Sequence, residues 1–148
     1  YQRRVREKSP PISLILQDKP YYVIKCNYNQ YPAQDIQDQT ITNGVFQMDF
    51  QRVTDRIRSN KINKGDMILI VYSQPKRYMG ANCLCEAIST NITKQTVELM
   101  IKFVRFLKRN ISLEELYDVD EELKQSFRIY QIGEKTFLQL LQLEIKDQ

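Results

Sequence analysis

MILIVYSQPKRYMGANCLCEAI, residues 67–88, consists of two apolar stretches separated by a short turn. The first stretch, Met67–Ser73, is apolar at almost every position, which is typical of a strand buried on both faces of a sheet. The second stretch, Gly80–Ile88, alternates two sets of side chains between its faces, as a strand does. The region therefore predicts two consecutive strands joined by a basic turn that carries Lys76, Arg77 and Tyr78.

Other segments also have the composition of strands. Pro20–Asn27 is rich in tyrosine, valine and isoleucine, which favour strands. Thr96–Phe106 is long, and its alternation places on one face Val97, Leu99, Ile101 and Phe103. Phe127–Ile132 is short and is expected to be the last strand.

Helices are predicted at three places. Phe50–Ser59 has one apolar face at positions i, i+3 and i+7 and begins after Asp49, a suitable N-cap. Ser112 and Glu115 have the spacing of a capping box, which opens a short helix. The segment Gly133–Ile145 ends the chain as an amphipathic helix with its inward side chains at Phe137, Leu140, Leu141 and Ile145.

Residues 28–43 are polar, rich in glutamine and interrupted by Pro32. We expect a long loop here, with no more than a short helical turn near Ala33–Asp38. Structureless loops of this length usually have a function or are disordered.

The order of these elements predicts one α+β domain built on a small curved or barrel-like sheet of about five to six strands with flanking helices. A chain of 148 residues fits a single domain of this kind. We expect residues 20–148 to form it. Residues 1–19 form a basic N-terminal arm and lead-in, whose charges are Arg3, Arg4, Arg6 and Lys8.

The composition disfavours several classes of protein. The chain has no histidine, which removes the usual general base and metal ligand, so we expect no enzyme, no metal and no cofactor. Its three cysteines include no C-x-x-C pair and are expected to be reduced core thiols. No apolar run reaches the length of a membrane span, and nothing marks the chain for secretion, so we expect an intracellular protein, nuclear or cytoplasmic.

Basic residues exceed acidic ones by four charges, which permits an anionic partner. They gather around the predicted helix Phe50–Ser59, which carries Arg52, Arg56 and Arg58, and its exit at Lys61 and Lys64. Such a set of charges is either a solvated face or part of a groove that holds phosphates.

The ordered segments resemble those of the YTH domain, a PUA-like fold that reads N6-methyladenosine in RNA. The resemblance covers about residues 20–143 and rests on YYVIKCN (21–27), GVF (44–46), MILIVYS (67–73), RYMG (77–80), FVRFLKRNISLEEL (103–116) and SFRIYQIGEK (126–135). It implies that the chain binds single-stranded RNA through a base pocket and a basic groove.

The resemblance also implies site residues. Lys25, Cys26 and Asn27 match the segment that lines the family's base pocket, and Phe46 and Gln47 match its first cage tryptophan and the residue after it. Phosphate contacts fall on Arg77 and Arg128, to which the helix arginines Arg52 and Arg56 can be added. Further aromatic side chains available to the pocket are Tyr28, Tyr31 and Phe50.

The sequence departs from the family in its aromatic cage. It contains no tryptophan, and the connection 89–95, where the family places its second cage tryptophan in a long loop, is short and has no aromatic residue. Two interpretations of Phe46 follow: it stacks on a base, or it packs in the core against Phe50 or Val53. Two functions follow as well: an RNA-binding domain without assured methyl specificity, or a degenerate YTH-like fold that serves as a protein-interaction or structural module in a ribonucleoprotein or nuclear complex.

Overall fold

The structure is a computed structural model in which residues 20–51 and 62–146 are described. Their elements, in chain order, are β1 (Tyr21–Asn27), α2 (Ala33–Asn43), β2 (Phe46–Gln51), β3 (Met67–Gln74), the 3₁₀ helix η1 (Lys76–Tyr78), β4 (Gly80–Ile92), β5 (Thr96–Ile111), α4 (Leu113–Val119), η2 (Glu121–Lys124), β6 (Ile129–Ile132), α5 (Glu134–Gln142) and η3 (Leu143–Ile145). The predicted α+β class is confirmed. The N-terminal arm lies outside the described residues.

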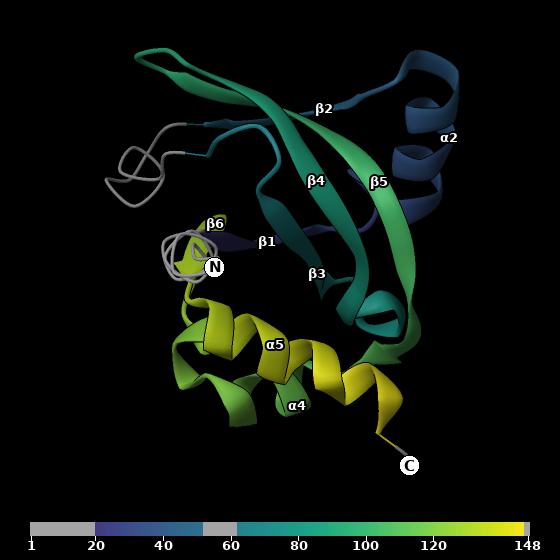
Figure 1. The fold of residues 1–148 in the computed structure, drawn as a ribbon, viewed down its shortest axis with the longest axis vertical. Coiled ribbons are helices and arrows are strands. Elements are labelled where there is room, and N and C mark those ends of the chain that lie inside the picture. The colour runs from purple at the N-terminus through teal and green to yellow at the C-terminus, as the bar shows by residue number, and fades with distance from the viewer. Residues whose placement is uncertain (1–19, 52–61, 147–148) are drawn as a thin grey trace, which may run out of the picture.

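The strands form one sheet in the order β2-β5-β4-β3-β1-β6. β1 and β3 are parallel, and the other neighbours are antiparallel. The long hairpin of β4 and β5 curves across the molecule, so the sheet curls into a half-barrel (Figure 1). α2 lies against one part of this sheet, whereas α4 and α5 lie together on the other side of it (Figure 1).

Two hydrophobic cores follow from the two faces of the sheet. In β1, Tyr22 and Ile24 point into a core shared with α2, and Tyr21 and Val23 point into a core shared with α4 and α5. β3 divides its side chains in the same way, with Ile68 and Ile70 on the first face and Leu69 and Val71 on the second. Central strands covered on both faces must be apolar at every position, which is why MILIV contains no polar residue.

The prediction of a helix that begins at Phe50 is wrong. Residues Phe46–Gln51 form strand β2, and its side chains alternate strictly between buried and exposed. The buried set is Phe46, Met48 and Phe50, and its period of two explains the strand. Asp49, expected as an N-cap, lies in the middle of this strand. The remainder of the predicted helix, with Arg52 and Arg56, lies outside the described residues.

The predicted loop 28–43 contains an eleven-residue helix, α2. Pro32 precedes it with its fixed φ, and Gly44 ends it in the left-handed conformation with φ of 85°. The helix buries only Ala33 and Ile36, so the sequence shows no clear amphipathic pattern. The Thr40 hydroxyl fixes α2 to the sheet because it accepts a hydrogen bond of 2.9 Å from the backbone N–H of Phe103.

The strand predicted to end at Phe106 continues to Ile111, and the capping box of Ser112 and Glu115 then starts α4 as predicted. Two bidentate ion pairs attach this part of the sheet to the helices. Arg105 contacts Glu144 at 2.7 Å, and Arg109 contacts Glu115 at 2.6 Å. α5 forms where it was predicted, and its side chains Phe137 and Leu140 are buried. The prediction of an inward Ile145 is wrong, because α5 ends at Gln142 and Ile145, at the end of η3, is 64% exposed.

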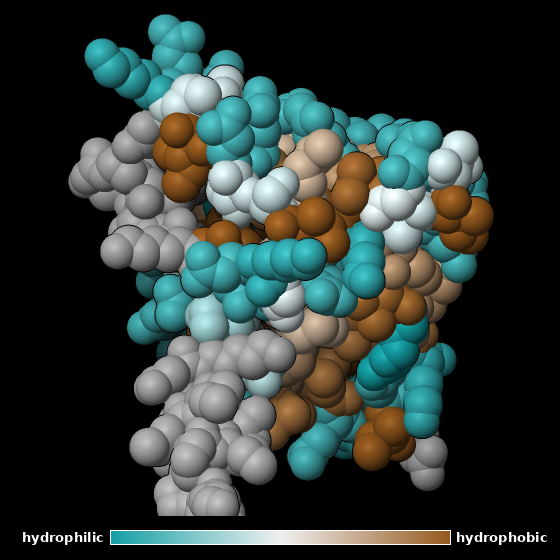
Figure 2. Space-filling view, turned by 45° about the horizontal axis from the view of Figure 1, so that its top comes forward, coloured by the Kyte–Doolittle hydropathy of each residue, from teal (hydrophilic) through white to brown (hydrophobic). Residues whose placement is uncertain are grey.

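Some apolar side chains stay on the surface. Figure 2 shows a band of apolar side chains that crosses one face of the molecule between hydrophilic ones. The large exposed apolar residues are Ile41, Ile92, Val104, Phe106, Leu138 and Ile145. Among the described residues, no helix is long and apolar enough to cross a membrane.

Candidate functional site

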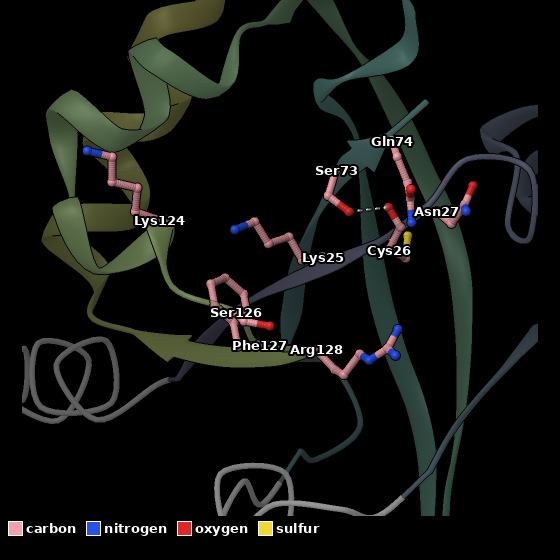
Figure 3. A pocket seen from close by; sticks show the side chains of 9 residues that line it. All are labelled: Lys25, Cys26, Asn27, Ser73, Gln74, Lys124, Ser126, Phe127 and Arg128. Carbon is pink, nitrogen blue, oxygen red and sulfur yellow. Dashed lines mark hydrogen bonds between the residues drawn. The ribbon is translucent and has the colours of Figure 1, made fainter. Parts of the chain in front are cut away.

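A polar cavity of about 350 Å³ lies where β1 and β3 end. β1 contributes Lys25, Cys26 and Asn27, and β3 contributes Ser73 and Gln74 (Figure 3). The segment that leads into β6 forms the opposite wall with Lys124, Ser126, Phe127 and Arg128. The volume falls within the range of small-molecule sites, roughly 300–1,000 Å³.

The parallel pairing of β1 and β3 creates this cavity. Because the strands run in the same direction, their carboxyl ends reach the same edge of the sheet, where ligands commonly bind. The register shifts between Cys26 and Asn27, which brings Asn27 opposite Gln74. The backbone N–H of Lys25 donates to the carbonyl of Arg128 at 2.9 Å and so holds the third segment beside the first.

Lys25 fixes the loop that forms the opposite wall. Its ammonium group donates to the carbonyl oxygens of Leu123 at 2.8 Å and Gln125 at 3.2 Å. It also lies 4.9 Å from the centre of the Phe127 ring. Burial lowers the pKa of this lysine. Lys25 therefore uses two of its three ammonium N–H donors to hold the opposite wall of the cavity in place.

Arg128 and Lys124 supply the positive charge that remains available. Among the described residues, no carboxylate lies within ion-pair distance of either side chain, in contrast to Arg105 and Arg109. Both residues are exposed. The guanidinium group of Arg128 extends toward Cys26 and Asn27, whereas Lys124 points away from the centre of the cavity (Figure 3). Arg128 is thus the better placed of the two to hold an anion in the cavity.

Cys26 is buried, with 3% of its surface exposed. Burial raises the pKa of its thiol to about 12, so the thiol is neutral at pH 7. A neutral thiol is a poor nucleophile. Cys26 contributes packing and a wall to the cavity.

A second cavity, of about 180 Å³, shares Arg128 with the first. It is lined by Arg128, by Gln30 from the turn after β1, and by Asp49, Phe50 and Gln51 of β2. β2 and β6 are the two edges of the sheet, and the cavity brings β2 together with Arg128, the residue that precedes β6.

Tyr31 joins β2 to the central strand β3. Its hydroxyl donates to the carbonyl oxygen of Asp49 at 2.8 Å and accepts from the backbone N–H of the same residue at 3.0 Å. The carbonyl oxygen of Tyr31 accepts a 2.7 Å hydrogen bond from the Tyr72 hydroxyl. Tyr31 is 8% exposed and belongs to the core. We call the place where Tyr31 and Arg128 meet β2 at Asp49–Gln51 the seam.

The structure brings together some of the predicted site residues and separates others. Lys25, Cys26, Asn27 and Arg128 line the larger cavity, and Phe50 lines the smaller one. Phe46 is 6% exposed, packs edge-on against Tyr31 at 5.9 Å and lines neither cavity. This placement agrees with its interpretation as a core residue. Gln47 is exposed on β2 and donates to the Asp49 carboxylate at 2.8 Å.

Tyr28 and Arg77 lie in an aromatic stack next to the larger cavity. The rings of Tyr28 and Tyr78 are parallel, with centres 3.7 Å apart, and the Arg77 guanidinium lies 4.9 Å from the centre of the Tyr78 ring. The N–H of Tyr28 donates to the carbonyl of Gln74, which connects the stack to the cavity rim.

The sequence prediction missed several lining residues, which are Ser73, Gln74, Lys124, Ser126 and Phe127 at the larger cavity and Gln30, Asp49 and Gln51 at the smaller one. Ser73 and Gln74 follow MILIV directly, so a parallel pairing of that strand with β1 would have indicated them. The alternation of Phe46, Met48 and Phe50 would have indicated Asp49 and Gln51 as outward-facing neighbours.

Similar solved structures share this fold. The human THYN1 protein in complex with 5-methylcytosine-containing DNA superposes with a TM-score of 0.71 at 16% sequence identity, over 88% of this chain and all of that one. A hypothetical protein from Leishmania major gives a TM-score of 0.66 at 16% identity, over 88% of this chain and 97% of that one. The DUF55 domain of human thymocyte nuclear protein 1 gives 0.61 at 14% identity, over 86% and 99%.

No family model and no curated protein matches the sequence. Likeness at these identities concerns the fold alone. The expectation of a PUA-like fold is therefore confirmed, and membership of the YTH family stays a prediction.

Proposed function

We propose that this chain binds single-stranded nucleic acid, RNA in the first place, with one base in the larger cavity and the adjoining phosphate on Arg128. The observation that carries the proposal is the position of Arg128, an exposed residue that lines a polar cavity and has no carboxylate partner among the described residues. Arginine is well suited to phosphate because its planar fork donates two parallel hydrogen bonds. The DNA complex of the human THYN1 protein supports the same class of ligand.

The lining of the cavity suits a nucleobase. The Asn27 and Gln74 side chains are amides that can both donate and accept, which is what the edge of a base requires. Phe127 offers a ring for stacking, and stacking of a base on an aromatic side chain contributes about 1–3 kcal/mol. A protein reads single-stranded RNA by combining such contacts.

We expect little preference for a methylated base. Phe127 is the one aromatic residue among the described side chains that line the larger cavity, so a methyl group there would not enter a cage of rings. The Tyr28 and Tyr78 rings cover each other and are not arranged as two separate walls. The base is held without chemical change, since the chain has no histidine and the Cys26 thiol is neutral.

Fluorescence anisotropy with labelled single strands of about ten nucleotides tests the proposal. Four probes of one sequence are compared: plain RNA, the same RNA with one N6-methyladenosine, the corresponding single-stranded DNA, and an RNA duplex. Each is titrated at several salt concentrations with the wild type, with Arg128→Gln and with Lys94→Gln. Lys94 lies in the turn between β4 and β5, so its variant matches the change in net charge away from the cavities.

We expect the single strands to bind more tightly than the duplex, and plain and methylated RNA to differ by less than about ten-fold. Arg128→Gln should weaken binding and reduce the slope of log affinity against log salt by about one, while Lys94→Gln leaves both nearly unchanged. Equal losses in the two variants would contradict a site at Arg128. Absence of binding to every probe would overturn the proposal and favour a protein-interaction module.

A further inference from the structure

Arg128 lines both cavities of the seam, and no other described residue does. The cavity at the ends of β1 and β3 and the cavity at β2 therefore adjoin each other at Arg128. A phosphate held by Arg128 would lie next to both of them. This is the arrangement that two consecutive nucleosides need, because one phosphate joins them.

We propose that the smaller cavity, formed by Gln30, Asp49, Phe50 and Gln51, is a second base site that binds the nucleoside next to the one in the larger cavity. The inference rests on the proposed function and adds to it a two-nucleotide footprint centred on Arg128. It also assigns a preference to the second position: a base that carries an exocyclic amino group, as cytosine, adenine and guanine do.

The Asp49 carboxylate determines this preference. An ionised carboxylate accepts hydrogen bonds and cannot donate them, so it pairs with an amino group of a base. It accepts one hydrogen bond from Gln47 at 2.8 Å, and a carboxylate has about four acceptor positions, so capacity remains for a ligand. The imino N–H of uracil stands between two carbonyl oxygens, which a carboxylate repels.

The backbone holds Asp49 in place for this role. Both its N–H and its carbonyl bond to the Tyr31 hydroxyl, so the residue cannot move without breaking the seam. Asp49 is exposed on β2, whereas its neighbour Phe50 is 5% exposed and anchors the strand in the core. Gln30 and Gln51 add amide groups to the lining of the same cavity.

The test compares oligocytidine with oligouridine of about ten nucleotides in the anisotropy assay, for the wild type, Asp49→Asn and Asp38→Asn. Asp38 is the matched control because it is exposed on α2 and its carboxylate also accepts one hydrogen bond from a glutamine, at 3.0 Å from Gln34. The readout is the ratio of the two dissociation constants, which cancels the gain in affinity that removal of any negative charge brings. Thermal unfolding of each variant verifies that the fold is intact.

We expect the wild type and Asp38→Asn to prefer oligocytidine by about ten-fold, as one carboxylate–amino contact provides. Asp49→Asn should bring the ratio close to one. If the strands bind in a salt- and Arg128-dependent manner but Asp49→Asn keeps the wild-type ratio, the second site is wrong and the proposed function stands. If neither oligonucleotide binds to any form of the protein, both proposals fail together.

Discussion

The hydroxyl of Tyr31 bonds twice to the backbone of Asp49, donating at 2.8 Å and accepting at 3.0 Å. Tyr31 follows β1, next to one edge of the sheet, and Asp49 lies in β2, the other edge. Two hydrogen bonds through one oxygen atom thus close the half-barrel beside Arg128. The candidate site consists of the two cavities that share Arg128 next to this contact.

Loss of the Tyr31 hydroxyl should open the seam. We expect Tyr31→Phe to lower the free energy of unfolding by about 1–3 kcal/mol, because it leaves the partly buried N–H and C=O of Asp49 without their partner. Urea unfolding followed by circular dichroism measures the change. Tyr28→Phe, in a ring stack without a described hydroxyl partner, serves as control and should change stability by less than about 0.5 kcal/mol.

The buried Glu144 should contribute more to the free energy of unfolding than an exposed carboxylate does. Its side chain is 6% exposed and accepts hydrogen bonds from both terminal nitrogens of Arg105 and from the backbone N–H of Lys108. We expect Glu144→Gln to cost about 1–3 kcal/mol, because it removes the charge while the groups around it stay in place. Glu121→Gln on the exposed 3₁₀ helix should cost less than about 0.5 kcal/mol in the same urea titration. Equal losses of unfolding free energy in the two variants would show that the ion pair of Glu144 with Arg105 does not stabilise the fold beyond an exposed carboxylate.

Stability should fall in acid through the same ion pairs. Hydrogen bonds from Arg109 hold the pKa of Glu115 at about 2, below its ordinary 4.5, and Arg105 lowers the pKa of Glu144. A carboxylate with a depressed pKa stabilises the fold above the pKa of the unfolded chain and loses this contribution as pH falls. We expect the free energy of unfolding to decrease from about pH 4.5 toward pH 2. The decrease should be smaller in Glu115→Gln, and an unchanged pH profile would contradict this assignment.

Gly80 should tolerate no side chain. It has φ of +124°, and a Cβ atom there would overlap the carbonyl oxygen of Ile111 and lie 2.8 Å from Asn110. We expect Gly80→Ala to lower the free energy of unfolding by more than about 2 kcal/mol. Gly44→Ala separates the two causes, because Gly44 has φ of +85° with open space around it and should cost only about 1 kcal/mol.

Lys25 should support binding because it holds the cavity wall in place, whereas Lys124 should support it through its positive charge. Lys25→Met removes both hydrogen bonds to the Leu123 and Gln125 carbonyls, so we expect lower stability and weaker binding of single-stranded RNA. Lys124→Met removes an exposed charge at the cavity and should weaken binding and reduce its salt dependence, by about one in slope, without loss of stability. Amide hydrogen exchange of residues 123–128 distinguishes the two, since only Lys25→Met should accelerate it.

Much of the fold was predictable because its signals are local. Strict alternation or a continuous apolar run identifies β1, β3, β4 and β5, and the capping box identifies α4. β2 and α2 were missed for opposite reasons. β2 begins a stretch whose apolar spacing also fits a helix, and α2 buries too few side chains to show a period.

The candidate site was less predictable because it joins residues far apart in the chain. Lys25, Asn27 and Arg128 were found through resemblance to a family, and each lines the larger cavity. Phe46 was assigned by the same resemblance, yet its ring is needed in the core against Tyr31. Sequence position alone could not show which outward neighbour on β2, Gln47 or Asp49, would line the same cavity as Arg128.

The sequence by itself determined the α+β class, the apolar central strands and the absence of histidine chemistry, because each depends on the residue types within a short segment. Only the tertiary structure decided where function can reside. The parallel pairing of β1 with β3 and the curl that brings β2 to Arg128 depend on hydrogen bonds between distant segments, such as those of Tyr31 with Asp49. These contacts place one arginine between two cavities, a relationship that no local pattern encodes.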